Sequence, residues 1–211
     1  MKKRKTIYHL IVDKSGSMFD CIDSTINGFN EQVNRIKSNE IEFKEEEITI
    51  GLTTFNTVVY HHFFQAKPTE VRPLNTDTYV PDGSTALLDA IGQTVLQIEN
   101  EVKITSQVIP TTTVIVILTD GYENASKMFN LDSIRNMISR LEETGNWTFS
   151  FIGATLDAVD VAKDLAIKAH NSFSFDKSEM SSMVWTKLNN SMTSYFDKKS
   201  KGKNTDNLFE D

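Results

Sequence analysis

The chain has 211 residues, of which 39% are hydrophobic and 24% are charged, and its formal net charge is −7. This length and composition are typical of a single globular domain with a sizeable core. The negative charge argues against nucleic acid as the main partner, because phosphate binding needs a basic surface. The single cysteine, Cys21, excludes an intrachain disulfide framework.

The sequence also argues against a membrane partner. No segment approaches the roughly 20 apolar residues needed to span a bilayer. The apolar run IYHLIV, which follows the basic start MKKRK, is too short for the core of a signal peptide. We therefore expect a cytoplasmic protein.

The first third of the chain predicts three strands and a helix. Residues 6–12 (TIYHLIV) are almost continuously apolar, which predicts a strand covered on both faces. Residues 48–55 (ITIGLTTF) and 57–64 (TVVYHHFF) predict two more strands. The link between these two is so short that they should form an antiparallel hairpin, with 57–64 at an edge of the sheet. Between the first two strands a helix is predicted by an apolar stripe at Ile22, Ile26, Phe29, Val33 and Ile36.

The rest of the chain alternates between strands and helices after a long loop. Residues 65–82 contain three of the four prolines and predict this loop. Apolar stripes and capping residues predict helices over residues 87–98, 132–145, 155–170 and 178–198. Apolar runs predict strands over residues 111–119, 147–154 and 171–176.

This alternation predicts an α/β fold. We expect a doubly wound, mostly parallel sheet with one antiparallel edge strand and helices on both faces, a three-layer sandwich. A single domain should cover residues 1–198. Residues 199–211 are rich in polar side chains and predict a disordered tail.

Polar side chains follow two of the buried strands at the points where they end. Asp13 and Asp120 terminate these strands, and Ser15 and Ser17 come directly after the first of them. The loop before the second helix offers the hydroxyl of Thr85. In open α/β sheets, ligands bind beyond the carboxyl ends of the strands, so these five side chains should share a crevice. Carboxylates and hydroxyls suit Mg²⁺, with Mn²⁺ or Ca²⁺ as alternatives.

Three segments, DKSGSM, GSTALLDAI and ILTDG, resemble in order the motif of the von Willebrand factor A domain. In that family the motif is called a metal-ion-dependent adhesion site. The resemblance covers residues 6–176 and includes all five motif positions. It implies that Ser15 and Ser17 bind the metal directly and that Asp13 and Asp120 act mainly through water. It also implies that Thr85 or Asp120 changes role between conformations.

The resemblance has two further implications. The family fold is a doubly wound sheet with one antiparallel edge strand, as expected above. Residues 151–167 and 173–176 look like the end of small stand-alone bacterial and phage members of the family.

The ligand chemistry predicts a binding module. Neutral hydroxyls donate little charge, so the metal stays electrophilic and open to a carboxylate from outside. We expect a partner protein that presents an Asp or Glu, and no enzymatic activity. The loops around the site, Met18–Asp20, Val80–Ser84 and Tyr122–Lys127, would select the partner, and they include Glu123 and Asn124 as candidate contacts.

Two alternatives remain open. One is a Mg²⁺-dependent phosphatase or hydrolase with Asp13 as the nucleophile, the position at which haloacid-dehalogenase-like phosphatases carry theirs. Those enzymes use D-x-D, whereas this chain has Ser15 in place of the second carboxylate, and the site loops contain no histidine to act as a base. The other alternative is an interaction domain whose metal is purely structural.

Overall fold

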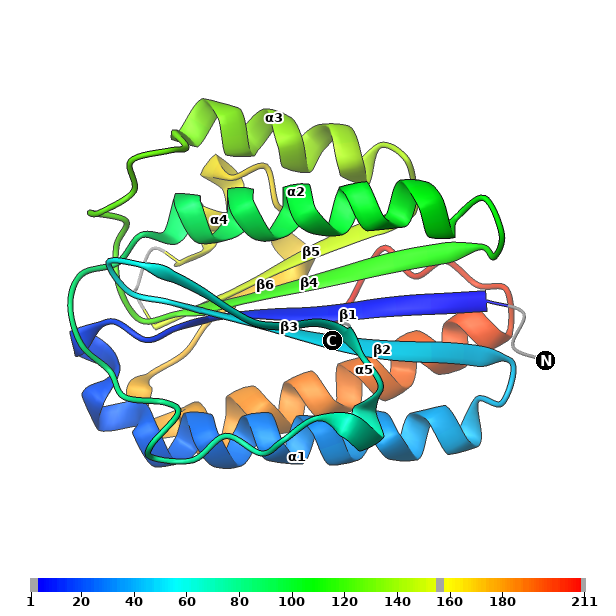
Figure 1. Cartoon of the computed structure of the whole chain (residues 1–211), viewed down its shortest axis with the longest axis horizontal. Helices are drawn as coiled ribbons and strands as arrows, with labels where there is room; N and C mark the ends of the chain where they lie inside the picture. Colours follow the sequence, from blue (N-terminus) through cyan, green and yellow to red (C-terminus); the bar gives the residue numbers. More distant parts are fainter. Residues whose placement is uncertain (1–3, 155–157, 210–211) are drawn as a thin grey trace.

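A computed structural model of the chain describes residues 4–154 and 158–209. Its centre is a six-stranded sheet with the order β3-β2-β1-β4-β5-β6 (Figure 1). The pairs β2–β1, β1–β4, β4–β5 and β5–β6 are parallel, and only β3 runs antiparallel, at one edge. This confirms the predicted sheet. The strands are β1 (Arg4–Asp13), β2 (Glu46–Phe55), β3 (Val59–Ala66), β4 (Thr111–Thr119), β5 (Trp147–Gly153) and β6 (Ser172–Ser174).

Helices cover both faces of the sheet (Figure 1). One face carries α1 (Ile22–Glu42) and α5 (Trp185–Ser200), and the other carries α2 (Leu87–Thr105), α3 (Leu131–Glu142) and α4 (Ala158–Asp164). Among the described residues, none of the helices combines the length and the apolar character that crossing a membrane requires.

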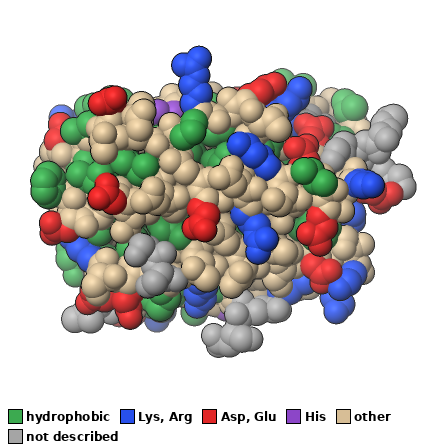
Figure 2. Space-filling view, turned by 90° about the horizontal axis from the view of Figure 1, so that it is seen from below, with side chains coloured by type: hydrophobic (Ala, Val, Ile, Leu, Met, Phe, Trp, Pro, Cys, Tyr) green, Lys and Arg blue, Asp and Glu red, His purple; other side chains and the backbone are tan. Residues whose placement is uncertain are grey.

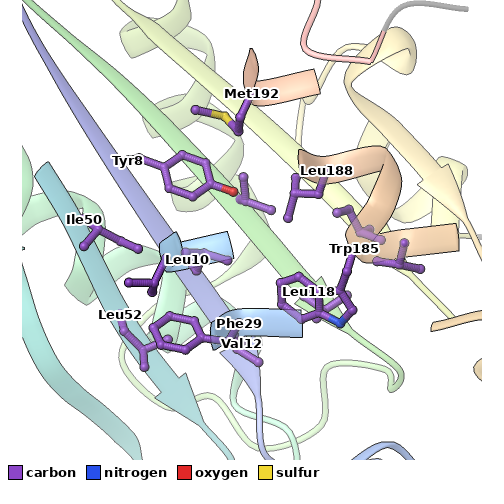
Figure 3. Close-up of a cluster of buried hydrophobic side chains, with 14 of the residues drawn as sticks. Tyr8, Leu10, Val12, Phe29, Ile50, Leu52, Leu118, Trp185, Leu188 and Met192 are labelled. Atoms are coloured by element: carbon purple, nitrogen blue, oxygen red, sulfur yellow. The ribbon is translucent and has the colours of Figure 1, made fainter. Parts of the chain in front are cut away.

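Two hydrophobic cores follow from the alternation of side chains along the strands. In β1, Tyr8, Leu10 and Val12 face α1 and α5, while the residues between them face α2. Figure 3 shows the first core, in which Phe29 of α1 and Trp185 of α5 pack over these strand residues. The two cores fix the sheet between its helix layers, so the strand ends are held in place.

The order of the strands creates the crevice predicted from the sequence. From β1 the chain crosses through α1 to β2 on one side of β1, and later through α2 to β4 on its other side. The loops that leave β1 and β4 therefore diverge at their carboxyl ends, which is where open α/β sheets bind ligands. Val12 lies opposite Leu118 in this pair of strands, so Asp13 and Thr119 lie at the same level.

A buried polar cluster lies at the amino ends of the central strands, opposite the predicted crevice. The Lys199 ammonium, from the last turn of α5, donates to Thr6 Oγ1 and Thr112 Oγ1, both at 2.7 Å, and pairs with the buried Glu46. The cluster ties the carboxyl end of α5 to β1, β2 and β4.

Two of the predicted helices have different bounds in the structure. The helix predicted over 155–170 ends at Asp164, because Ala166 adopts φ 64° and the amides of Ala166 and Ile167 close the helix end onto Lys163 and Ala162. Residues 155–157 of that prediction lie outside the described residues. The last predicted helix begins as a 3₁₀ turn (Lys177–Glu179) and a π-helical turn (Met180–Val184) before α5.

The end of the chain also differs from the expected disordered tail. After α5, residues 201–209 fold back onto the sheet, and Leu208 and Phe209 are buried in the first core. The side chain of Asn171 accepts from the Leu208 amide at 2.7 Å and donates to the Asp206 carbonyl at 2.8 Å. Two apolar side chains thus anchor a segment whose composition is otherwise polar.

Candidate metal centre

The carboxylate of Asp13, the last residue of β1, is fully buried at the centre of the site. One of its oxygens accepts from the Ser15 amide at 2.7 Å, and the other accepts from Thr119 Oγ1 at 2.6 Å. Its backbone carbonyl accepts from the buried Tyr79 hydroxyl at 2.6 Å. These bonds fix the direction of the carboxylate at the end of the strand.

The loop after β1 brings two hydroxyls beside Asp120. Ser15 Oγ lies 3.1 Å from Ser17 Oγ, which donates to Asp120 Oδ1 at 2.6 Å. The Gly16 amide donates to the Gly83 carbonyl at 3.1 Å, which joins this loop to the one that precedes α2. Ser15 is buried whereas Ser17 is exposed, so the group of oxygens opens to solvent at Ser17.

The hydroxyl of Thr85 completes the group. A methyl group added to Gly121 would lie 3.2 Å from Thr85 Oγ1, 3.5 Å from Ser17 Oγ and 3.9 Å from Asp13 Oδ2. The three oxygens therefore surround one point, which Gly121 leaves open. The structure thus brings together all five residues singled out in the sequence, and their role as metal ligands stays a prediction.

The donor set fits a hard divalent cation. It consists of two carboxylates and three hydroxyls, and it contains no nitrogen or sulfur. In the part of the chain that the structure describes, no group of three or more His, Cys, Asp or Glu side chains could hold a metal ion, and this site has only two such side chains because its other oxygens are hydroxyls. Oxygen ligands of this kind suit Mg²⁺ or Mn²⁺ better than zinc or copper.

The electrostatics of Asp13 favour a cation beside it. Burial, and to a smaller extent the negative charge of Asp120, raise the pKa of this carboxyl to about 6 against the opposing hydrogen bonds from Thr119 and Ser15. The ionised form is therefore held in an unfavourable environment. A positive ion among these oxygens would offset that cost.

The architecture matches several solved structures. The von Willebrand factor domain of the type V pili tip protein Mfa5 from Porphyromonas gingivalis has a TM-score of 0.58 and 10% identity, over 91% of this chain and 96% of that one. The manganese-loaded TRAP protein of Plasmodium vivax has a TM-score of 0.56 and 17% identity, over 87% and 72%. The ArnB paralog VWA2 from Sulfolobus acidocaldarius has a TM-score of 0.55 and 13% identity, over 89% and 45%.

The fold is that of a von Willebrand factor A domain. No protein-family model matches the sequence, and no curated protein matches it either. The chain spans about half the length of some of the solved structures that it matches, including 46% of proximal thread matrix protein 1 from the mussel byssus.

In this von Willebrand factor A fold, Lys177 contacts the site although the sequence pattern did not indicate it. Its ammonium lies 2.5 Å from Asp120 Oδ2 and donates to the Ser17 carbonyl at 2.9 Å. Partial burial opposes the charge of Lys177, but the hydrogen bond and attraction to Asp120 outweigh it and raise its pKa. Because 57 residues separate the two charges, no local pattern could have indicated the pair.

Asn124 and Glu123, predicted as partner contacts on the rim, also make internal contacts, and their role toward a partner stays a prediction. Asn124 Oδ1 accepts from the Thr85 amide at 2.9 Å, and the Asn124 amide donates back to the Thr85 carbonyl at 3.0 Å. Glu123 accepts from the amides of Leu88, at 2.8 Å, and Ser126, at 2.7 Å. Both side chains hold Thr85 and the start of α2 against the loop after β4.

Asp89 also holds the loop after β4 against α2. An acidic side chain in the first turn of a helix is favourable in itself, but Asp89 makes specific contacts as well. Its carboxylate accepts from the backbone amides of Lys127, Met128 and Phe129, each at 2.9 Å. Three charge-assisted hydrogen bonds to one loop make Asp89 an anchor for the segment between β4 and α3. The loop that carries Asp120 is thus fixed to α2 at several points.

Proposed function

We propose that this chain is a metal-ion-dependent protein-binding module. Asp13, Ser15, Ser17, Thr85 and Asp120 would hold a divalent ion, Mg²⁺ in the first instance, and the ion would accept an Asp or Glu carboxylate from a partner protein. The observation that carries the proposal is the convergence of these five oxygen-bearing side chains at the carboxyl edge of a von Willebrand factor A fold. The manganese-loaded state of a neighbour with this fold supports it.

The residues of the site would have different roles in binding the ion. Ser15, Ser17 and Thr85 contribute neutral oxygens, so the bound ion keeps most of its positive charge for an incoming carboxylate. Thr119 and the Ser15 amide orient Asp13, and Asn124 positions Thr85. Ser17 is exposed, which leaves this side of the site accessible from solvent.

Exposed apolar side chains near the site favour a protein as the partner. Large hydrophobic residues with more than half of their surface exposed lie in the segments around the site, among them Phe19, Val58, Val80 and Tyr122. Each of them lies close in sequence to the site. Phe19 and Tyr122 are two residues from Ser17 and Asp120, and Val58 and Val80 are next to or near residues whose hydrogen bonds join the site loops to one another. Figure 2 shows hydrophobic side chains at this end of the α1 and α5 face (left). Apolar and aromatic anchors around a polar centre are typical of protein interfaces.

The geometry disfavours the hydrolase alternative. A nucleophilic carboxylate has to reach its substrate, whereas Asp13 is fully buried and both of its oxygens accept hydrogen bonds. The four histidines lie in β1, β3 and a turn before β6, and not in the site loops. Phosphatase activity that requires Mg²⁺ and disappears in Asp13→Asn would favour the hydrolase instead.

Metal binding is tested by calorimetric titration of Mg²⁺ into the wild type and three variants. Ser17→Ala removes a hydroxyl and should weaken binding at least tenfold. Gly121→Ala should also weaken it, because its methyl group would fill the point that the oxygens surround, while its backbone φ is not positive and accepts alanine. Ser38→Ala on the exposed surface of α1 is the control and should bind like the wild type. Equal binding in all four proteins, or none in the wild type, would refute the metal site.

Recognition is tested separately by capture of partners from lysate in Mg²⁺. Proteins retained by the wild type should elute with EDTA and should not be retained by Ser17→Ala. Partners that stay bound in EDTA would show that the metal does not mediate the contact.

A further inference from the structure

A side chain of this chain already places a positive charge on the candidate metal site. The Lys177 ammonium lies 2.5 Å from Asp120 Oδ2 and 2.9 Å from the Ser17 carbonyl, so it contacts two of the five predicted ligand residues. The side chain of Asp120 is fully buried, whereas that of Lys177 is 37% exposed. The ammonium thus lies between the Asp120 carboxylate and solvent. Without it, Asp120 would be buried beside a second negative charge, that of Asp13.

The turn that carries Lys177 is built to hold it there. Asp176 caps the turn and accepts from the Ser178 amide at 2.9 Å and the Ser178 hydroxyl at 2.7 Å. On either side, Phe175 and Met180 are buried in the core next to α1. The backbone of Phe175 is bonded to the Gly153 carbonyl at 3.0 Å. The backbone that carries Lys177 is therefore anchored at the site and is not a free surface loop, so withdrawal of the ammonium would be a movement of the side chain.

An ammonium and a divalent ion compete for the same carboxylate. Both would lie within a few ångströms of Asp120, and like charges at that distance repel strongly where the surroundings are partly buried. The carboxylate also has a limited number of lone pairs, and one of them already accepts a hydrogen bond from the Ser17 hydroxyl. Binding of the ion would be easier if the lysine withdrew.

We propose that Lys177 is a tethered cation that neutralises Asp120 when no divalent ion is bound, and that metal binding exchanges the ammonium for the ion. The inference rests on the proposed metal site and adds its regulation. The exchange sets the affinity of the site, because the ion has to displace an intramolecular competitor. It also links metal occupancy to the turn that leads into α5.

The first test compares Mg²⁺ affinity in the full chain. Lys177→Met keeps the aliphatic stem and removes the charge, and it should bind Mg²⁺ at least ten times more tightly than the wild type at low salt. Lys177→Arg retains a cation and should stay near the wild-type affinity. Lys44→Met is the control for net charge and should leave the affinity unchanged. Lys44 is exposed just before β2, at the amino end of that strand and away from the site.

The second test measures the exchange itself by acylation of lysine amines and peptide mass spectrometry. In the wild type, saturating Mg²⁺ should raise the labelling rate of Lys177 and leave that of Lys44 unchanged. In Ser17→Ala, which lacks one metal ligand, the same rise at Lys177 should need an at least tenfold higher Mg²⁺ concentration.

The outcomes separate the two proposals. Wild type and Lys177→Met that bind Mg²⁺ equally well, or labelling of Lys177 that does not respond to Mg²⁺, would overturn the exchange and leave the metal site standing. A failure of both proteins to bind Mg²⁺ would overturn the metal site and the exchange together.

Discussion

Asp13 carries a charge in a place where an uncharged side chain would be more stable. Its pKa of about 6, against an ordinary value of 3.8, means that the folded chain binds the proton more tightly than the unfolded chain does. The ionised carboxylate therefore destabilises the fold above pH 6, and this penalty fades as the pH falls from 6 toward 3.8. The difference between the two pKa values corresponds to a loss of about 3 kcal/mol at most from the free energy of unfolding.

Asp13→Asn should accordingly stabilise the metal-free protein by about 1–2 kcal/mol at pH 7.5, with a smaller gain at pH 4.5. The amide can accept from Ser15 N and donate to Thr119 Oγ1, which can turn its own proton to the Gly121 carbonyl, 3.2 Å away. Urea unfolding in EDTA at the two pH values measures the effect. Added Mg²⁺ should stabilise the wild type and not the variant. A variant that is less stable than the wild type at pH 7.5 in EDTA would contradict the argument.

The five candidate ligands could be found from the sequence because each stands at a strand end or a helix start. Asp13 and Asp120 follow apolar runs, and Thr85 precedes an apolar stripe. Lys177 and Asp89 could not be assigned their roles in this way. Their contacts cross 57 and about 40 residues, and a lysine in a polar segment is typical of a solvated turn.

The carboxyl end of α4 contains a residue that its backbone conformation disfavours. Ala166 has φ 64° and occupies the position after the helix at which glycine is common, between the amide bonds that close the helix end. A side chain with a Cβ is strained in this region by about 1 kcal/mol. The periodicity of the segment continued past Asp164, so the sequence predicted a longer helix.

Ala166→Gly should therefore raise the free energy of unfolding by about 0.5–1 kcal/mol, because glycine relieves the strained φ at the cost of a more flexible unfolded chain. Urea denaturation measures the change. Ala162→Gly, inside the same helix and buried, is the matched control and should lower stability by about 1 kcal/mol or more. Destabilisation by both substitutions would show that Ala166 is not strained.

At the scale of the whole molecule, the alternation of strands and helices was enough to predict the sheet, its antiparallel edge strand and the two helix layers. The path of the last residues was not predictable from composition. In KGKNTDNLFED only Leu208 and Phe209 are apolar, and a pair of apolar residues does not indicate where it packs. Their site is formed by residues far along the chain, including Phe173, whose ring lies 4.8 Å from that of Phe209.

Leu208→Ala tests whether the end of the chain is part of the fold. Leu208 is 2% exposed, so truncation should lower the free energy of unfolding by about 2–4 kcal/mol. Leu96→Ala, at a position that is 42% exposed on α2, is the control and should change it by less than about 1 kcal/mol. Thermal and urea unfolding of the full chain measure both. A loss at Leu208 no larger than that at Leu96 would show that residues 201–209 do not contribute to the core.

The cluster around Lys199 has a mechanical consequence. Besides the packing of α5 in the core, a lysine binds each end of its segment: Lys177 at the carboxyl ends of the strands, and Lys199 at their amino ends, where it contacts Thr6, Thr112 and Glu46. Only the first of these contacts involves a group that an incoming ion would claim. Release of Lys177 would remove the ion pair at one end of the segment while Phe175 and Met180 stay buried and the Lys199 cluster stays formed. The movement that accompanies metal binding would therefore be confined to the Lys177 side chain and its turn, and α5 would keep its position along its axis.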